Sequence, residues 1–328
     1  MNITRRLMMI GSICTALTHQ TIFAQTTEDY PNRPITIVVP FTPGGVTDIT
    51  TRLIGQKMSE KLNQTVIIEN KPGAGGNIAA SYVARSPANG YTLFLATIGT
   101  HAINQNLYKT MPYDGEKDFA PLSRLAVFPN LLVVPANSPY QTVSDLIIFG
   151  KNNPGKLTFG SPGNGTSSHL SGELFKLMTG VNMEHIPYKG SSPANADLIS
   201  GQISLMFDAI PSASTNIKAN RTRALAITSK DRNALLPEIP TLDESGVKGY
   251  ELIAWVGLVA PAGTPQPIVD KLYKVIAEVL ASQEVKDKLL SLGANAAPQT
   301  PKEFAGYIKE EAARWRKVIS EAKISINN

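Results

Sequence analysis

The stretch ITIVVPFTPGGVTDITTRLI, residues 35–54, decides the fold. Its first seven residues, 35–41, are β-branched and almost continuously apolar, which is typical of a buried parallel strand. From Val46 to about Asn63, apolar residues recur every three or four positions, and this spacing predicts an amphipathic helix. A strand, a glycine-rich turn and a helix in this order begin a parallel α/β unit.

The same order recurs along the chain. Further strands are predicted at residues 65–69, 91–98, 131–135, 157–160, 183–187, 203–208, 224–228 and 255–260. Helical patterns separate most of them, and the last two helices are expected to begin near Pro265 and Pro301. Strands that alternate with helices predict an α/β protein whose sheets are mostly parallel and flanked by helices.

The length of the chain and its final helices predict two lobes. A chain of 328 residues, 42% hydrophobic and 17% charged, is long for one core. The last two helices need a sheet to cover, and the first α/β unit has three strands of its own. We therefore expect residues 25–127 and 252–328 to form lobe 1 and residues 128–251 to form lobe 2. Two crossings between the lobes would make a hinge.

Residues 1–24 have the pattern of a signal peptide that directs the chain to the periplasm. Arg5 and Arg6 precede the short apolar run 7–17, and Ala24 offers a small residue for cleavage. The single cysteine, Cys14, lies in that run, so the mature chain has no disulfide or thiolate chemistry. Removing both arginines lowers the formal net charge from +5 to +3, because 29 basic residues then face 26 acidic ones. This small excess argues against nucleic-acid binding.

Glycine-rich turns follow the predicted strands at residues 40–48, 70–77, 97–101 and 160–169. Ligands of open parallel sheets bind at the carboxyl ends of strands, beside helix N-termini. Those helix ends carry unpaired amides and partial positive charge, and glycine lets a ligand approach them closely. Two facing turns could hold a carboxylate without an arginine. The alternative is that the glycines serve only to make tight turns.

Two acidic residues are candidates for ligand contact, each with a structural alternative. Asp48 lies in the first turn of the first helix, where it either meets the ligand or caps amides. Asp208 ends the strand ISLMFD, where it either meets an amino or hydroxyl group or has a surface or capping role. His101 and His169 are expected to make hydrogen bonds at helix starts, and ligand contact is the alternative.

Enzyme and cofactor motifs are incomplete. Residues 150–157 have the P-loop spacing, but Leu157 replaces the Ser or Thr that holds Mg²⁺. Residues 163–168 are similar to a dinucleotide fingerprint, with Ser168 in place of the third glycine. A nucleotide-dependent enzyme is therefore an alternative to a binding protein. Four histidines without paired spacing argue against a metal site, and we expect no cofactor.

From about Tyr30 to the C-terminus the chain resembles the Bug family, the periplasmic receptors of tripartite tricarboxylate transporters. The resemblance is carried by PFTPGGVTDITTRLI (40–54), IIENKPGAGGNIAA (67–80), GSPGNGTSSHLSGELF (160–175), IPYKGSSPANADLISGQISLMFD (186–208) and GLVAPAGTP (257–265). It implies a two-lobed type II periplasmic binding fold that closes on a small carboxylic acid and delivers it to a membrane permease. We expect a monomer that binds without catalysis. A sensory adaptor for a membrane kinase would use the same pocket.

The resemblance also implies which residues grip the ligand. The first lobe would contribute Phe41, Thr42, Gly44, Gly45 and Asp48, to which we add Thr100 of the third turn. The second lobe would contribute Ser161, Gly163, Gly165, Thr166 and Ser167, with Asp208 at the distal part of the ligand.

Overall fold

A computed structural model describes residues 29–321 and 324. The predicted signal peptide, residues 1–24, lies outside the described residues. The described residues from 31 onward form one compact unit, built on a single mixed sheet of ten strands. The sheet has two halves, and the predicted lobe boundaries at residues 127 and 252 remain a prediction.

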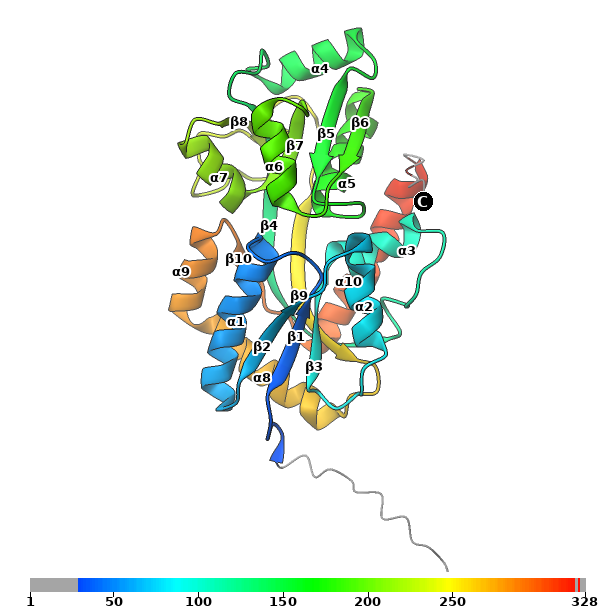
Figure 1. Ribbon diagram of the computed structural model, residues 1–328, viewed down its shortest axis with the longest axis vertical. Helices are drawn as coiled ribbons and strands as arrows, with labels where there is room; N and C mark the ends of the chain where they lie inside the picture. The colour runs from blue at the N-terminus through cyan, green and yellow to red at the C-terminus, as the bar shows by residue number, and fades with distance from the viewer. Residues whose placement is uncertain (1–28, 322–323, 325–328) are drawn as a thin grey trace, which may run out of the picture. The chain divides into compact units, whose positions relative to one another are not determined.

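The first half of the sheet begins with three parallel strands. β1 (Ile35–Val39) lies between β2 (Val66–Asn70) and β3 (Thr92–Thr97), with Ile37 opposite Ile68 and Leu93. The connections form α1 (Val46–Leu62), the short turn η2 (Ala74–Gly76) and α2 (Asn77–Ala84). After β3 the chain forms a π-helical turn, η3 (Gly99–Ile103), and α3 (Asn104–Leu107). The predicted βαβαβ unit is therefore present (Figure 1).

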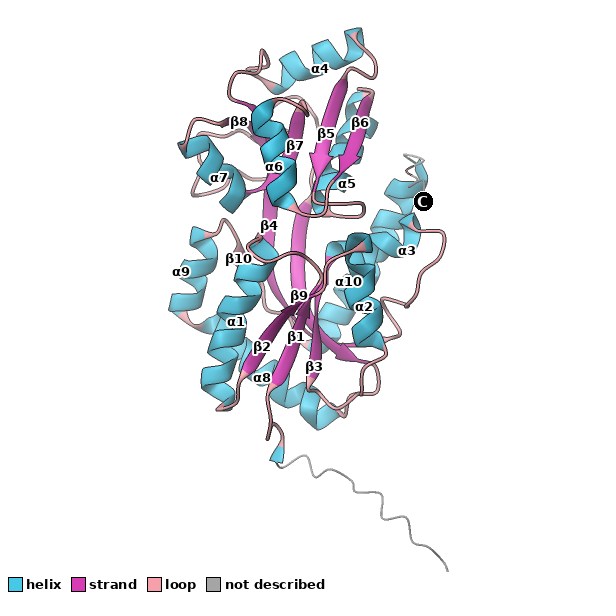
Figure 2. Cartoon of the chain, viewed as in Figure 1, coloured by secondary structure: helices cyan, strands magenta, loops and turns pink. Residues whose placement is uncertain are grey.

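The second half repeats this design. The parallel strands are β5 (Leu157–Ser161), β6 (Met183–Pro187) and β7 (Leu205–Ala209), joined by α5 (Ser167–Thr179) and α6 (Ser191–Ser200). α4 (Val143–Asn152) precedes them, and α7 (Ile210–Lys218) and β8 (Thr222–Ile227) follow. Helices lie on both faces of these strands (Figure 2). The predicted capping of α4 is confirmed, because the Thr142 side chain accepts from the Asp145 amide and the Asp145 carboxylate accepts from the Thr142 amide.

One long strand joins the two halves. β4 (Phe119–Pro135) pairs with β9 (Ile253–Pro261) through residues 119–129, and with β7 and β8 through residues 130–135. All these pairs are antiparallel, so the sheet is mixed. The prediction of mostly parallel strands holds only for the three outermost strands at each end of the sheet, β2-β1-β3 and β7-β5-β6. The predicted separate strand 131–135 is the end of β4. Sequence reasoning missed residues 119–129 because Pro121 and Pro129 argue against a strand; β4 accommodates Pro121 where its register with β9 shifts.

The C-terminal segment returns to the first half, as expected. It forms α8 (Gln266–Ala281), α9 (Gln283–Ser291), the short strand β10 (Asn295–Ala296) and α10 (Pro301–Glu321). α10 packs on β4, and Trp255 of β9 meets the ring of Phe304 edge-on at 5.6 Å between centroids. Phe304, Ile308 and Trp315 are buried. None of the helices in the described part of the chain is long and apolar enough to cross a membrane.

Replacing Phe304 by alanine tests whether α10 is an integral part of the first half. Phe304 is fully buried, so Phe304→Ala leaves a cavity against Trp255 and is expected to lower the free energy of unfolding by about 3–5 kcal/mol. Urea denaturation measures the loss. Lys309→Ala, on the exposed side of the same helix, is the control and should change stability by less than about 0.5 kcal/mol. Equal losses in both variants would contradict this packing.

Candidate functional site

A cavity of about 440 Å³ lies at the carboxyl ends of strands from both halves of the sheet. The first half contributes the turn after β1 and the end of β3, and the second half contributes the turn after β5 and the end of β7. β4 and β9, which run between the halves, supply Phe128, Asn130 and residues 254–256. Seven predicted site residues line this cavity: Phe41, Thr42, Gly44, Gly45, Thr166, Ser167 and Asp208.

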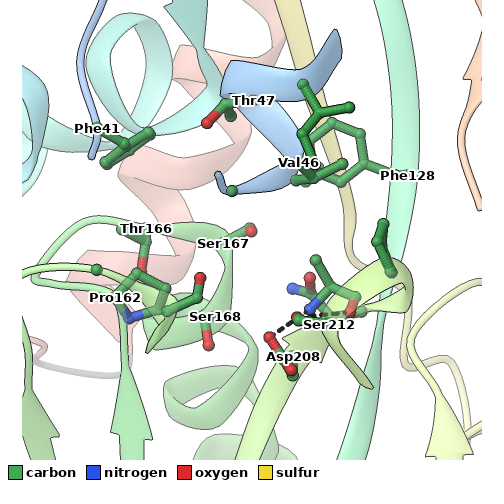
Figure 3. Close-up of a pocket in the computed structure, with 18 of the residues that line it drawn as sticks. Phe41, Val46, Thr47, Phe128, Pro162, Thr166, Ser167, Ser168, Asp208 and Ser212 are labelled. Carbon is green, nitrogen blue, oxygen red and sulfur yellow. Dashed lines mark hydrogen bonds between the residues drawn. The ribbon is translucent and has the colours of Figure 1, made fainter. Parts of the chain in front are cut away.

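The turn after β1 presents the N-terminus of α1 to the cavity. No side chain caps this helix, and its first internal hydrogen bond runs from the Ile49 amide to the Gly45 carbonyl, at 3.0 Å. The amides of Val46 and Thr47 therefore have no partner within the helix. Figure 3 shows Val46 and Thr47 at the cavity wall. A helix end of this kind carries partial positive charge and attracts anions.

Asp48 lies behind this turn and is not among the residues that line the cavity. Its carboxylate accepts hydrogen bonds from the Gly44 amide at 3.0 Å, from Arg52 Nε at 3.0 Å and from Asn70 Nδ2 at 2.9 Å. Burial opposes ionisation of Asp48, but hydrogen bonds from Arg52, Gly44 and Asn70 hold its pKa below the usual value. Of the two roles expected for Asp48, these contacts support the structural one: it fixes the turn.

The turn after β5 presents the N-terminus of α5 in the same way. Thr166 caps this helix, since its Oγ1 accepts from the His169 amide, and the first internal bond runs from Leu170 to Thr166. The amides of Ser167 and Ser168 thus lack partners within the helix. Figure 3 shows Ser167 and Ser168 below Phe41 and Thr47. The Ser168 hydroxyl donates to the Phe207 carbonyl.

Ser161, Gly163 and Gly165 shape the second turn and do not line the cavity. The Gly163 amide donates to Ser161 Oγ at 3.1 Å, and the Gly165 amide donates to His169 Nδ1 at 3.2 Å. Both glycines have positive φ, +144° and +75°, which side chains rarely adopt. Thr100 also does not line the cavity, although residues 97–99 do. Its hydroxyl accepts a hydrogen bond from the Thr97 amide at 3.0 Å.

Two stacked histidines support the second turn. The rings of His169 and His185 lie 4.0 Å apart between centroids, and His185 Nε2 lies 2.6 Å from Ser161 Oγ. Burial lowers the pKa of His185 to about 3 and holds the pKa of His169 well below its usual value. Both rings are therefore neutral near pH 7. The hydrogen bond expected of His169 at its helix start is present.

Glycine contacts bring the turns of the two halves together. An ideal Cβ on Gly99 would lie 2.7 Å from the Gly165 carbonyl oxygen, and one on Gly75 would lie 2.5 Å from the Asn164 carbonyl oxygen. On the other side, a Cβ on Gly190 would lie 2.7 Å from Thr42 Oγ1. Such approaches leave no room for side chains. The structure therefore shows the turns packed against each other beside the cavity.

Asp208 is buried at the cavity, 1% exposed. Its Oδ2 accepts from Asn195 Nδ2 at 3.1 Å, and its Oδ1 accepts from the Ala209 amide at 2.9 Å. Asn216 in turn donates to Asn195 Oδ1 at 3.0 Å. Burial raises the pKa of Asp208 to about 6, against the opposing effect of these hydrogen bonds.

Sequence reasoning missed the polar residues that α6 and α7 add to the cavity. These are Ser191, Ser192, Asn195, Ser212, Thr215 and Asn216. The signal was present in the sequence, because SSPAN at 191–195 and PSASTN at 211–216 place Ser and Asn in the first two turns of these helices. Neither stretch follows the glycine-rich pattern on which the prediction depended. Among the described residues, no group of three or more His, Cys, Asp or Glu could hold a metal ion.

Known proteins share this architecture. Residues 50–324 match the family model described as tripartite tricarboxylate transporter family receptor. The chain belongs to this receptor family. BugT of Bordetella pertussis is 36% identical over 98% of each chain. The fold is that of a periplasmic binding protein, since the structure titled periplasmic binding protein BugD, 35% identical, superposes with a TM-score of 0.85 over 90% of this chain and all of that one.

A second solved structure is similar to most of the chain. An R. palustris protein solved with adipate is 42% identical and has a TM-score of 0.88, covering 91% of this chain and all of that one. The predicted resemblance to the Bug family is thereby confirmed. The receptors that match are binding proteins.

A pair of glycine substitutions tests the contact between the turn after β5 and Asn104 of α3. Gly165 and Gly155 share a φ of +75°, so alanine strains the backbone equally at either position. A Cβ on Gly165 would lie 2.0 Å from Asn104 Oδ1, whereas a Cβ on Gly155 meets nothing within 4 Å. We expect Gly165→Ala to lower the free energy of unfolding by at least about 1 kcal/mol more than Gly155→Ala, as measured in urea. Matching losses would show that this turn and Asn104 are not packed as described.

The histidine pair predicts acid sensitivity. His185 has an ordinary pKa of 6.5 when unfolded and about 3 when folded, so between these values the unfolded state binds more protons. The free energy of unfolding should therefore fall as pH drops below about 6.5, with a slope below about 1.4 kcal/mol per pH unit from this residue. Urea titrations between pH 4 and 7 should show a shallower dependence for His185→Gln. An unchanged slope would contradict the assignment.

Proposed function

We propose that this protein is a periplasmic solute-binding receptor that captures a small carboxylate and delivers it to a membrane permease of the tripartite tricarboxylate type. One observation carries the proposal: the N-termini of α1 and α5, from opposite halves of the sheet, open onto the same cavity. We further propose that the two halves act as lobes, residues 25–127 with 252–328 and residues 128–251, and close on the ligand.

The helix ends supply what a carboxylate needs in a buried site. A carboxylate loses its water shell there and must receive hydrogen bonds in exchange. The amides of Val46, Thr47, Ser167 and Ser168, together with the Ser167 hydroxyl, are the available donors, since the Ser168 hydroxyl already donates to the Phe207 carbonyl. Each helix end stabilises a nearby negative charge by about 0.3–1 kcal/mol, and by up to about 2 kcal/mol when partly buried. Lys, Arg and His are absent from the described residues that line the cavity.

The relatives support the class of ligand and the partner. The R. palustris protein that is 42% identical was solved with adipate, a dicarboxylate. The description of the matching family names a tripartite transporter, of which the receptor is one part. Binding without turnover is supported by the cavity itself, because its described lining offers a single ionisable side chain, Asp208, and no acid–His–nucleophile set.

The nucleotide alternative receives less support. Residues 163–168 do lie between a strand and a helix, as a dinucleotide fingerprint should. The amides of Gly163 and Gly165, however, already donate to Ser161 and His169. Residues 150–157 run from a helix into a strand, which is the reverse of P-loop order.

A thermal-shift screen tests the proposed function. Adipate, succinate, citrate, aspartate, glutamate and nicotinate should be compared with NAD and ATP. We expect at least one acid to raise the melting temperature in a concentration-dependent way, since a ligand of the folded state stabilises it; at 100 times Kd the gain is about 2.7 kcal/mol. A rise in melting temperature with nucleotides alone would support the enzyme alternative. If none of the acids changes the melting temperature, the proposal of carboxylate capture is wrong.

The variant Gly45→Val tests the helix end itself. Gly45 has φ −80°, and a Cβ there would meet nothing within 4 Å, so the fold accommodates valine. The added methyl groups would occupy the space in front of the α1 amides. The ligand-induced shift should be lost while the melting temperature without ligand stays the same. Gly306→Val, on the exposed face of α10, also meets no neighbour and should leave binding intact.

A further inference from the structure

The two sides of the cavity differ in charge. Positive partial charge comes from the starts of α1 and α5. Among the described lining residues, Asp208 is the one ionisable side chain. Figure 3 shows Asp208 beside Ser212, across the cavity from Phe41 and Thr47. A ligand that places one carboxylate at the helix starts therefore brings its other end toward a wall that contains an acid and no cation.

The position of Asp208 is fixed by neutral groups. Asn195 donates to Oδ2, the Ala209 amide donates to Oδ1, and Asn216 orients Asn195 by donating to its amide oxygen. Amide donors of this kind hold a carboxyl group in place without neutralising it. Burial without a cation favours the protonated form, and the pKa of about 6 for Asp208 agrees with this.

Charged groups on the neighbouring elements do not compensate Asp208. None of them lines the cavity: these are Asp48, Arg52, Lys57, Glu60 and Lys61 on α1, Arg124 on β4, His169, Glu173 and Lys176 on α5, Lys189 just before α6, Asp197 on α6 and Lys218 on α7. Most are engaged elsewhere. Asp48 pairs with Arg52, Glu173 pairs with Lys176, and Asp197 accepts from the Tyr188 hydroxyl at 2.6 Å. Lys218 lies exposed in the last turn of α7.

We propose that Asp208 sets the charge allowed at the far end of the ligand. The cavity takes acids that carry one carboxylate and, at the other end, an amine or hydroxyl that donates to Asp208. A second carboxylate enters only together with a proton held by Asp208, because two neighbouring carboxylates cannot both stay ionised in a buried site. This inference rests on the proposed capture of a carboxylate at the helix starts.

Three six-carbon acids test the proposal, since they differ only at one end: adipate, 6-hydroxyhexanoate and 6-aminohexanoate. Calorimetry at pH 6 and pH 8 measures their affinities for the mature protein. A group with a pKa of about 6 is half protonated at pH 6 and almost fully ionised at pH 8, so adipate should bind about 50-fold more weakly at pH 8. Titrations in buffers of different ionisation enthalpy should show close to one proton taken up with adipate at pH 8. The other two acids should change less than about 3-fold.

The variant Asp208→Asn tests whether Asp208 holds the proton that is taken up with adipate. Asparagine keeps the shape of the side chain without its charge, so the variant should bind adipate equally well at pH 6 and pH 8 and should bind 6-aminohexanoate more weakly than the parent protein does. Asp197→Asn removes an acid of α6 that does not line the cavity, and it should keep the full pH dependence.

The outcomes separate this inference from the proposed function. The proposed role of Asp208 is wrong if adipate binds equally at both pH values, or if Asp208→Asn keeps the pH dependence. Neither result contradicts carboxylate capture. A different result would contradict the proposed function itself: none of the three acids, and no acid of the thermal-shift screen, binds either the parent protein or Asp208→Asn. In that case the role of Asp208, which rests on carboxylate capture, is wrong as well.

Discussion

The unpaired amides at the starts of α1 and α5 are the feature on which the site depends. A parallel strand followed by a helix leaves such donors at the carboxyl edge of the sheet. One helix start gives a weak anion site; two that face one cavity can surround a carboxylate from both sides. β4 and β9 make this arrangement possible, because they run between the halves and bring two separate α/β units to a common edge.

In each turn a buried side chain accepts a hydrogen bond from a glycine amide. In the first turn the Asp48 carboxylate accepts from Gly44, and in the second the Ser161 hydroxyl accepts from Gly163. These contacts fix the turns and engage the amides of Gly44 and Gly163, and they leave the amides of the first helical turns as donors for a ligand. The stacked pair of His169 and His185 supports the second turn only while both rings stay neutral.

Selectivity has a different origin from affinity in this arrangement. The helix starts attract any small anion, whereas the opposite wall is built from β7, α6 and α7 and contains Asp208 with its asparagine partners. The electrostatic character of that wall decides which second functional group is accepted. Glycine contacts between the turns, such as Gly99 with Gly165, bring both walls close enough to act on one small molecule.

The sequence by itself determined the local features: the strand 35–39, the helix after it, the capping of α4 and the glycine turns that begin α1 and α5. Each depends on neighbours within a few residues, which is the range over which periodicity and turn chemistry act. Only the tertiary structure decided that residues 119–129 continue into β4, that Asp48 and Ser161 bond within their turns, and that Asn195 and Asn216 reach Asp208. Those outcomes depend on strand pairing and helix packing between segments far apart in the chain, and the direction of a side chain is fixed only when such segments meet.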